Sequence, residues 1–229
     1  DSDDWVSPDC YEKLLKKAED TGADMVGCDY NLVNEQTFKV GKVVQNNNVD
    51  QTGLLDDEKH KSLILRSGSM VVKIYEIIRE HGLDFPENIF YEDNCAGPVW
   101  SLYFTHFERV EEPLYYYYQH NASTVHYVTE EKCRARMTAG ALLLQEMKDR
   151  GFLNKYYQEI EYRFAELYYV ITLFSYMLGV KRKQLSFVKE LKQGVLSAFP
   201  EFQKNAYYQQ YTNEEEKQMI ALQMKSDKK

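Results

Sequence analysis

The sequence lacks any apolar stretch long enough to cross a membrane, because its longest uncharged run, residues 167–180, is short and rich in tyrosine. Cysteine is also scarce: there are four, far apart, with no C-x-x-C pair. Such scatter argues against a disulfide framework or a zinc site and is typical of reduced, buried thiols in a cytosolic protein. We therefore expect a soluble protein, or one bound at the periphery of a membrane.

The sequence also has little positive charge: it contains 28 Lys and Arg residues against 36 Asp and Glu residues, and its net charge is −8. This balance argues against a nucleic-acid-binding protein, which needs a concentrated basic surface. A glycine-rich phosphate loop is also missing, which counts against phosphoryl transfer. What remains is a chain of 229 residues, 44% hydrophobic and 28% charged, with the composition of an ordinary globular protein of one large or two small domains.

The first third of the chain has the element order of an α/β protein. Ser7 and Pro8 predict a helix start, with Ser7 as N-cap and Pro8 in the first helical position, and Gly22 predicts its end. The apolar run at residues 23–30 predicts a buried strand. An acidic loop, a helix and a buried strand in succession indicate an α/β fold.

Further elements follow up to about residue 127. Residues 38–49, broken by glycine and three asparagines, predict a hairpin or exposed loop. The remaining predictions are helices at 57–66, around Ile74–Ile78 and at 94–104, and a strand at 107–118 with a bend at Glu111-Glu112-Pro113.

From about Thr129 onward the pattern becomes helical, and we expect a helical region over residues 128–229 after an α/β domain over 1–127. One apolar stripe predicts a long helix used for core packing or for a helical partner. The basic turn at 181–183 is an ordinary solvated turn or, on a peripheral enzyme, a contact for anionic lipid. The stripe consists of Ile160, Phe164, Leu167, Ile171, Phe174 and Leu178.

Three carboxylates, those of Asp1, Asp3 and Asp4, are crowded into one short loop before the first helix. Packed carboxylates repel one another, and a hard cation such as Mg²⁺ or Mn²⁺ relieves that repulsion through oxygen ligands. A cation held there could also bind a diphosphate. The alternative is a solvated acidic loop with Asp4 beside the helix N-terminus, because such a motif is weak by itself.

The pair Glu92-Asp93 is the second candidate, as burial of one carboxylate in a half-apolar cleft would suit it to general base catalysis. Its alternative is an ordinary acidic helix N-terminus. The third candidate is the tyrosine run 115–118, which predicts a strand with one face buried and the other lining a cleft that could hold a sugar ring. His120 and His126 follow this run, where a single histidine is more often structural.

The order of these segments resembles family-two glycosyltransferases of bacterial cell-surface polysaccharide synthesis, over roughly residues 1–126. The resemblance rests on D-S-D-D-W-V-S-P followed by a helix and an A-D-M-V strand, V-K-I-Y at 72–75, G-L-D-F-P at 82–86, Y-E-D at 91–93, E-P-L-Y-Y-Y-Y at 112–118 and N-A-S-T at 121–124. The helical remainder carries no diagnostic motif.

This resemblance implies a GT-A fold with a mixed sheet, and an inverting transferase that moves a hexosyl unit from a nucleotide sugar, UDP-linked, to a carbohydrate or lipid-linked acceptor. It implies that Asp1 and Asp3 form a D-x-D element, with Asp3 or Asp4 facing Mg²⁺ or Mn²⁺ and the donor phosphates. Asp93 would be the general base and Glu92 would support it. The candidates for donor or acceptor contacts are Lys73, Tyr91, His120 and Ser123.

The family's nucleotide-binding half precedes the D-x-D element, and we expect it to be missing here. From this follow three expectations: the isolated chain is inactive, an exposed sheet edge favours a homo-oligomer, and the parent enzyme works in the cytoplasm or at the inner face of the membrane. Two alternatives stay open, namely a non-catalytic helical interaction module and a metal-dependent phosphoryl-transfer enzyme, which would also use clustered aspartates.

Overall fold

The chain forms two compact units, one α/β and one helical. The first consists of Asp1–Pro86 and Ala96–Tyr127, and the second of Glu87–Cys95 and Val128–Lys229. The second unit is therefore discontinuous, since a nine-residue segment of it is inserted in the sequence of the first. The computed structural model describes residues 3–34, 37, 39–75, 78, 80–119 and 128–225.

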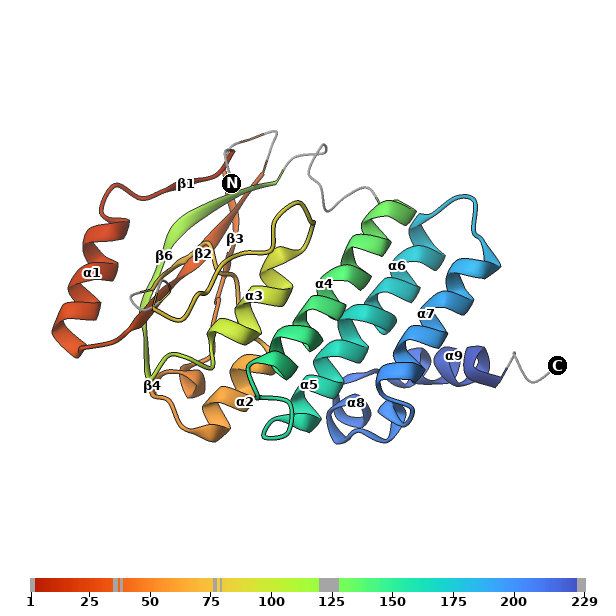
Figure 1. Cartoon of the computed structure of the whole chain (residues 1–229). Helices are drawn as coiled ribbons and strands as arrows, with labels where there is room; N and C mark the ends of the chain where they lie inside the picture. The colour runs from red at the N-terminus through yellow and green to blue at the C-terminus, as the bar shows by residue number, and fades with distance from the viewer. Residues whose placement is uncertain are drawn as a thin grey trace. The chain divides into compact units, whose positions relative to one another are not determined.

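The first unit is built on a mixed sheet, whose long central strands β2 and β6 are parallel while every other strand pair is antiparallel (Figure 1). The order is β1-β6-β2-β3, with β4 also paired to β6 and β5 also paired to β2. This confirms the predicted α/β class. The strands that the structure describes are β1 (Trp5–Val6), β2 (Met25–Asn34), β3 (Val40–Val44), β4 (Gly53–Leu54), β5 (Lys73–Tyr75) and β6 (His106–Gln119).

Helix α1 (Cys10–Thr21) covers one face of this sheet and creates its core there (Figure 1). Its Leu14 is buried to 2% exposure against Val26 of β2 and Leu114 of β6. Other apolar side chains pack on the opposite face, where the ring of Tyr75 lies 5.4 Å from that of Phe104. The helices α2 (Asp57–Leu65) and α3 (Glu92–Trp100) contribute further apolar residues, and a 3₁₀ turn spans Val49–Gln51.

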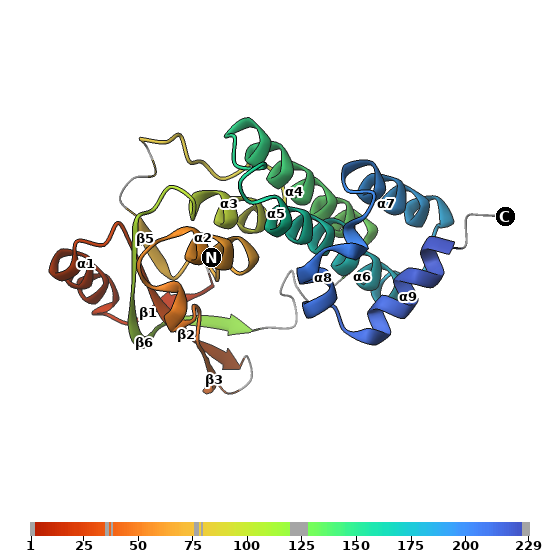
Figure 2. The same ribbon diagram turned by 90° about the horizontal axis from the view of Figure 1, so that it is seen from below.

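The second unit is a helical bundle in which α4, α6 and α7 lie side by side, with α8 and α9 following along the chain (Figures 1 and 2). Thr129 caps α4 by accepting from the N–H of Lys132. The helices are α4 (Glu130–Asp149), α5 (Tyr157–Phe164), α6 (Thr172–Gly179), α7 (Leu185–Ala198), α8 (Ala206–Tyr211) and α9 (Glu214–Lys225), with a 3₁₀ turn at Phe202–Lys204.

A π-helical segment, Ala165–Ile171, joins α5 to α6 and breaks the predicted apolar stripe. Up to Leu167 the stripe is buried, but Ile171 is 38% and Leu178 85% exposed. A π-helix bonds residue i to i+5, so seven such residues rotate the apolar face away from its α-helical phase. Tyr168 of this segment fills the space beside Gly194 of α7, where an added Cβ would lie 2.1 Å from its hydroxyl.

Two other predictions are wrong in detail. Helix α1 begins at Cys10 with Asp9 as N-cap, because the backbone N–H of Ser7 is bound to the carbonyl of Leu114 and extends the β1 pairing (2.8 Å). The helix predicted around Ile74–Ile78 is wrong at its start, where Lys73–Tyr75 form β5 and pair with β2, and residues 76 and 77 lie outside the described residues. The four cysteines are buried free thiols, as predicted, and no helix within the described ranges has the length and apolarity needed to cross a membrane.

Candidate functional site

The acidic motif lies at the start of the first unit, where strand β6 holds one of its carboxylates firmly. Asp4 accepts from the Tyr115 hydroxyl at 2.5 Å through Oδ2 and from the Tyr118 N–H at 2.8 Å through Oδ1. Burial, followed by the bond to Asp4, raises the pKa of Tyr115, so this hydroxyl stays a neutral donor. Asp3 is exposed. Asp4 is thus held by two hydrogen bonds, whereas Asp3 is accessible to solvent. Asp1 lies outside the described residues.

The tyrosine run after the bend alternates between two sets of neighbours, as the sequence predicts: Tyr115 and Tyr117 join the core around Leu14, and Tyr116 and Tyr118 lie against Trp5. Tyr115 is buried, whereas Tyr116 stacks on Trp5 of β1 with ring centroids 5.4 Å apart and planes 7° from parallel. The two rings belong to residues paired directly opposite each other in the β1–β6 register, so the stacking fixes the strand that directly follows the acidic motif. His120 and Ser123, which the resemblance assigns to ligand contacts, lie outside the described residues.

The acidic motif offers the ligand type that Mg²⁺ and Mn²⁺ prefer. Within the part of the chain that the structure describes, no three His, Cys, Asp or Glu side chains form a metal-binding group. The described donors are the carboxylates of Asp3 and Asp4, and Mg²⁺ is commonly held by one or two carboxylates together with phosphate oxygens and water. The residues present therefore fit a cation that is completed by a bound diphosphate rather than one enclosed by protein.

Lys73 of β5 is the second candidate in the first unit, and its side chain is unusually placed for a lysine. Its Nζ donates to the carbonyl of Ser67 and lies 5.5 Å from the ring centroid of Phe107. Gly27 of β2 leaves the room that its stem occupies, because a Cβ there would lie 3.1 Å from Lys73 Cγ. Burial lowers the pKa of Lys73 to about 7, so this amine is close to losing its charge at neutral pH.

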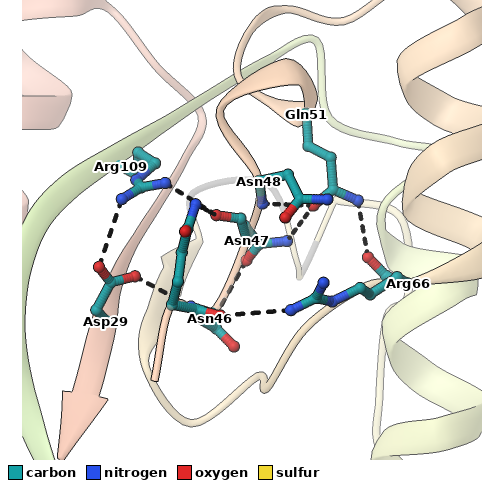
Figure 3. Close-up of polar contacts among 8 residues, drawn as sticks. Asp29, Asn46, Asn47, Asn48, Gln51, Arg66 and Arg109 are labelled. Carbon is teal, nitrogen blue, oxygen red and sulfur yellow. Dashed lines mark hydrogen bonds and ion pairs between the residues drawn. The ribbon is translucent and has the colours of Figure 1, made fainter. Parts of the chain in front are cut away.

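A buried polar cluster, which the sequence does not predict, lies in the first unit (Figure 3). It shares the Ser67 carbonyl with Lys73, because both Asn47 Nδ2 and Lys73 Nζ donate to it. Asp29 of β2 accepts from the Asn46 N–H at 3.0 Å and from Arg109 Nη2 at 3.4 Å, and Arg109 Nη1 donates to the Asn47 carbonyl at 3.0 Å. Gln51, fully buried, accepts from Asn47 Nδ2 at 3.1 Å. The cluster consists of the buried Asp29, Asn46, Asn47 and Gln51, of Arg109, and of the exposed Asn48 and Arg66, whose backbone groups bond Gln51.

This cluster fixes the loop that binds the Lys73 amine. Asn47 Nδ2 donates to the Ser67 carbonyl at 3.2 Å, and the Asn46 side chain exchanges two hydrogen bonds with the Ser69 backbone, at 2.7 and 3.1 Å. Of the range 38–49, predicted as a hairpin or exposed loop, residues 40–44 form a single strand, β3, which pairs with the earlier β2. Two of its three asparagines are not exposed: Asn46 and Asn47 are 5% and 2% exposed. Their polarity serves internal hydrogen bonds.

The pair Glu92-Asp93 opens helix α3 and belongs to the second unit, as does Tyr91. Asp93 is exposed and its Oδ1 accepts from Asn94 Nδ2 at 2.9 Å. Asn94 Oδ1 in turn accepts from Arg163 Nη2 of α5 at 2.9 Å. Of the predicted residues, Asp3, Asp4 and Lys73 belong to the first unit, and Tyr91, Glu92 and Asp93 belong to the second. The structure does not bring Lys73 to the acidic motif: Asp4 bonds Tyr115 and Tyr118 towards the end of β6, whereas Lys73 lies beside Phe107 at its start.

Comparisons with known proteins agree with this architecture. Residues 1–82 match the family model described as glycosyl transferase family 2. EpsH of Bacillus subtilis (strain 168), whose name assigns it provisionally to the glycosyltransferases, is 29% identical over 219 residues, which are 90% of this chain and 60% of that protein. The chain thus spans less than two thirds of the length of this relative.

Two crystal structures of S. aureus TarS, residues 1–349, share the fold. The complex with UDP has a TM-score of 0.55 at 16% identity and covers 87% of this chain and 55% of TarS. The complex with UDP-GlcNAc has a TM-score of 0.52 at 15% identity and covers 88% and 56%. The fold is that of a GT-A glycosyltransferase. The resemblance to family-two glycosyltransferases is confirmed, and the first 82 residues carry the family pattern.

Proposed function

We propose that the protein containing this chain is an inverting glycosyltransferase that moves a sugar from a UDP-linked donor to a hydroxyl of a carbohydrate or lipid-linked acceptor. The observation that carries this proposal is the family match over residues 1–82, because that segment includes the acidic motif. The TarS complexes with UDP and UDP-GlcNAc support the choice of a uridine nucleotide. We further propose that the protein takes part in surface polysaccharide synthesis at the cytoplasmic side of the membrane. The exposed basic turn 181–183 supports contact with anionic lipid there.

The reaction we propose is a single displacement at the anomeric carbon. The acceptor oxygen forms a bond to that carbon, the bond to the diphosphate oxygen breaks, and the proton of the acceptor hydroxyl passes to the carboxylate of Asp93. Asp3, the exposed carboxylate next to Asp4, would hold Mg²⁺ or Mn²⁺ beside the donor phosphates. When bound, the cation supplies positive charge that stabilises the leaving diphosphate.

Donor binding is tested by thermal denaturation of the protein at its full natural length. The panel is UDP-glucose, UDP-galactose and UDP-N-acetylglucosamine, each with and without manganese, for wild type and Asp3→Asn. A ligand that binds the native state raises the melting temperature. We expect one donor to give a manganese-dependent rise that Asp3→Asn abolishes, while Asp20→Asn, an exposed carboxylate of α1, leaves it intact.

Catalysis is tested by the release of UDP from that donor. Asp93→Asn should lower the turnover number by about 10²–10⁴-fold, the usual range for a general base, without loss of the manganese-dependent thermal shift. A protein that shows no shift with any nucleotide sugar, or a fully active Asp93→Asn, would contradict the proposal. The helical interaction module would then become the better description.

A further inference from the structure

Two arginine side chains of the helical unit contact the residues directly before and directly after the pair Glu92-Asp93. Before the pair, the guanidinium of Arg136 on α4 lies 4.4 Å from the ring centroid of Tyr91. After the pair, Arg163 of α5 donates to Asn94. All of these residues belong to the second unit, so this geometry is internal to one compact body.

Arg163 is itself fixed by the helical unit. Its Nη1 donates to Glu166 Oε2 at 2.6 Å, and the other oxygen of Glu166 accepts from the Tyr162 hydroxyl at 2.8 Å. The Arg163 side chain is only 14% exposed and that of Glu166 26%. Water screens a partly buried, charge-assisted hydrogen bond of this kind only weakly. The pair therefore holds the Arg163 guanidinium in one position.

The chemistry of arginine decides which way the Asn94 amide points. A guanidinium can only donate hydrogen bonds, so Asn94 must turn its oxygen to Arg163 and its NH₂ group to Asp93. The NH₂ group then donates to Asp93 Oδ1 at 2.9 Å. Tyr162, Glu166, Arg163, Asn94 and Asp93 thus form one continuous chain of hydrogen bonds.

The backbone before the pair is held in a costly conformation. Tyr91 has a φ angle of 68°, in the left-handed region that a bulky residue rarely adopts. Such a conformation persists only where surrounding contacts fix it. Arg136 supplies that contact through its stacking on the Tyr91 ring, and its Nη1 is held in turn by Ser175 Oγ at 3.2 Å.

We propose that Arg163, acting through Asn94, is a positioning residue for the Asp93 carboxylate, and that Arg136 positions the preceding backbone. Binding of Oδ1 by Asn94 determines which carboxylate oxygen is left to take the acceptor proton. The helical region therefore orients the Asp93 carboxylate, the general base, and is more than a non-catalytic interaction module. This inference rests on the proposed function, because it concerns the same carboxylate.

The kinetic test uses the protein at its full natural length, UDP-N-acetylglucosamine as donor, manganese, and UDP release as readout. Arg163→Met should lower kcat roughly ten- to hundredfold, the scale of a misplaced catalytic group, while KM for the donor changes less than about twofold. The double variant Arg163→Met/Asn94→Ala should lose no more than Asn94→Ala alone, because both act along one path. Arg134→Met is the matched control, since Arg134 of α4 is ion-paired to Glu130 and Glu190, and it should keep full activity.

Hydrogen–deuterium exchange gives a second readout that needs no turnover. Backbone amides 91–95 should exchange at least severalfold faster in Arg163→Met than in wild type or Arg134→Met. Unchanged exchange there would overturn the positioning role whether or not the protein transfers sugar. Faster exchange with unchanged kcat, or additive losses in the double variant, would overturn its link to catalysis. A fully active Asp93→Asn, or no UDP release by wild type, would overturn the proposed function and this inference with it.

Discussion

Gln51 offers a quantitative test of the buried polar cluster, because its side chain bonds backbone groups on two segments. Its Oε1 accepts from the Asn48 N–H at 3.0 Å, and its Nε2 donates to the carbonyls of Ser62 and Arg66 at 3.2 and 2.9 Å. Gln51→Met keeps nearly the same volume and removes these hydrogen bonds. The Ser62 carbonyl still accepts a hydrogen bond from the Arg66 N–H. Two backbone groups therefore lose the hydrogen bond to Gln51, namely the Asn48 N–H and the Arg66 carbonyl.

Leaving a buried backbone group without a partner costs about 1–3 kcal/mol. Asn48 and Arg66 are exposed residues whose backbone water can partly reach, so we take the lower half of that range for each. The expected loss is about 2–4 kcal/mol in the free energy of unfolding of the first unit. For a protein of this size, that corresponds to a fall of about 4–16 °C in the melting temperature.

Tryptophan fluorescence isolates this unit during urea unfolding, because both tryptophans of the chain, Trp5 and Trp100, belong to it. Gln145→Met is the matched control, since Gln145 is exposed on α4 and its Nε2 donates to the exposed Asp149 one turn later in the same helix, at 2.8 Å. It should leave the fluorescence midpoint unchanged. A loss below about 1 kcal/mol for Gln51→Met would refute the reasoning, since it would mean that water replaces the cluster at little cost.

Two further predictions concern the acidic motif and Lys73. Asp4→Asn should lower the stability of the first unit by about 1–3 kcal/mol in urea unfolding, because it weakens the charge-assisted hydrogen bonds from the Tyr115 hydroxyl and the Tyr118 N–H. Because burial depresses the pKa of Lys73 to about 7 from about 10.5, the unfolded chain binds more protons between these values, and the stability of the first unit should rise from pH 7 to pH 10. Lys73→Met should remove that rise, and a wild-type slope equal to that of the variant would contradict the prediction.

The parts of the fold that the sequence predicts are those set by local chemistry. The bend at Glu111-Glu112-Pro113 coincides with the register shift between β2 and β6, where Asn31 Nδ2 binds the Pro113 carbonyl at 2.8 Å. Proline cannot donate to a sheet ladder, so a break there follows from the residue type. The buried strand 23–30 was equally readable, because apolar and β-branched residues fill it.

The errors arise where long-range partners override local pattern. The asparagines at 46–48 are typical of a surface loop, and only the fold supplies Asp29, Gln51 and Ser69 as their partners. The apolar stripe is predicted at the α-helical period, and that period fails at the π-helical segment Ala165–Ile171.

The candidate site is less predictable than the fold for the same reason. Asp3, Asp4 and Asp93 are predicted as site residues by their place in an ordered set of motifs, and they stay predictions. The hydrogen bonds that hold the Asp93 carboxylate cannot be predicted in this way, because Asn94 and Arg163 lie 69 residues apart in the sequence. No local pattern distinguishes Arg163 from any other arginine on a helix.

The insertion of Glu87–Cys95 into the sequence of the first unit has a consequence for how this protein could evolve. A helical unit confined to the end of a chain can be gained, lost or exchanged by one recombination event. Here such an event near residue 128 would remove Arg136 and Arg163 and leave behind the segment that they hold. Substitutions in the helices and in that segment are therefore expected to co-vary, and the two units to be inherited together.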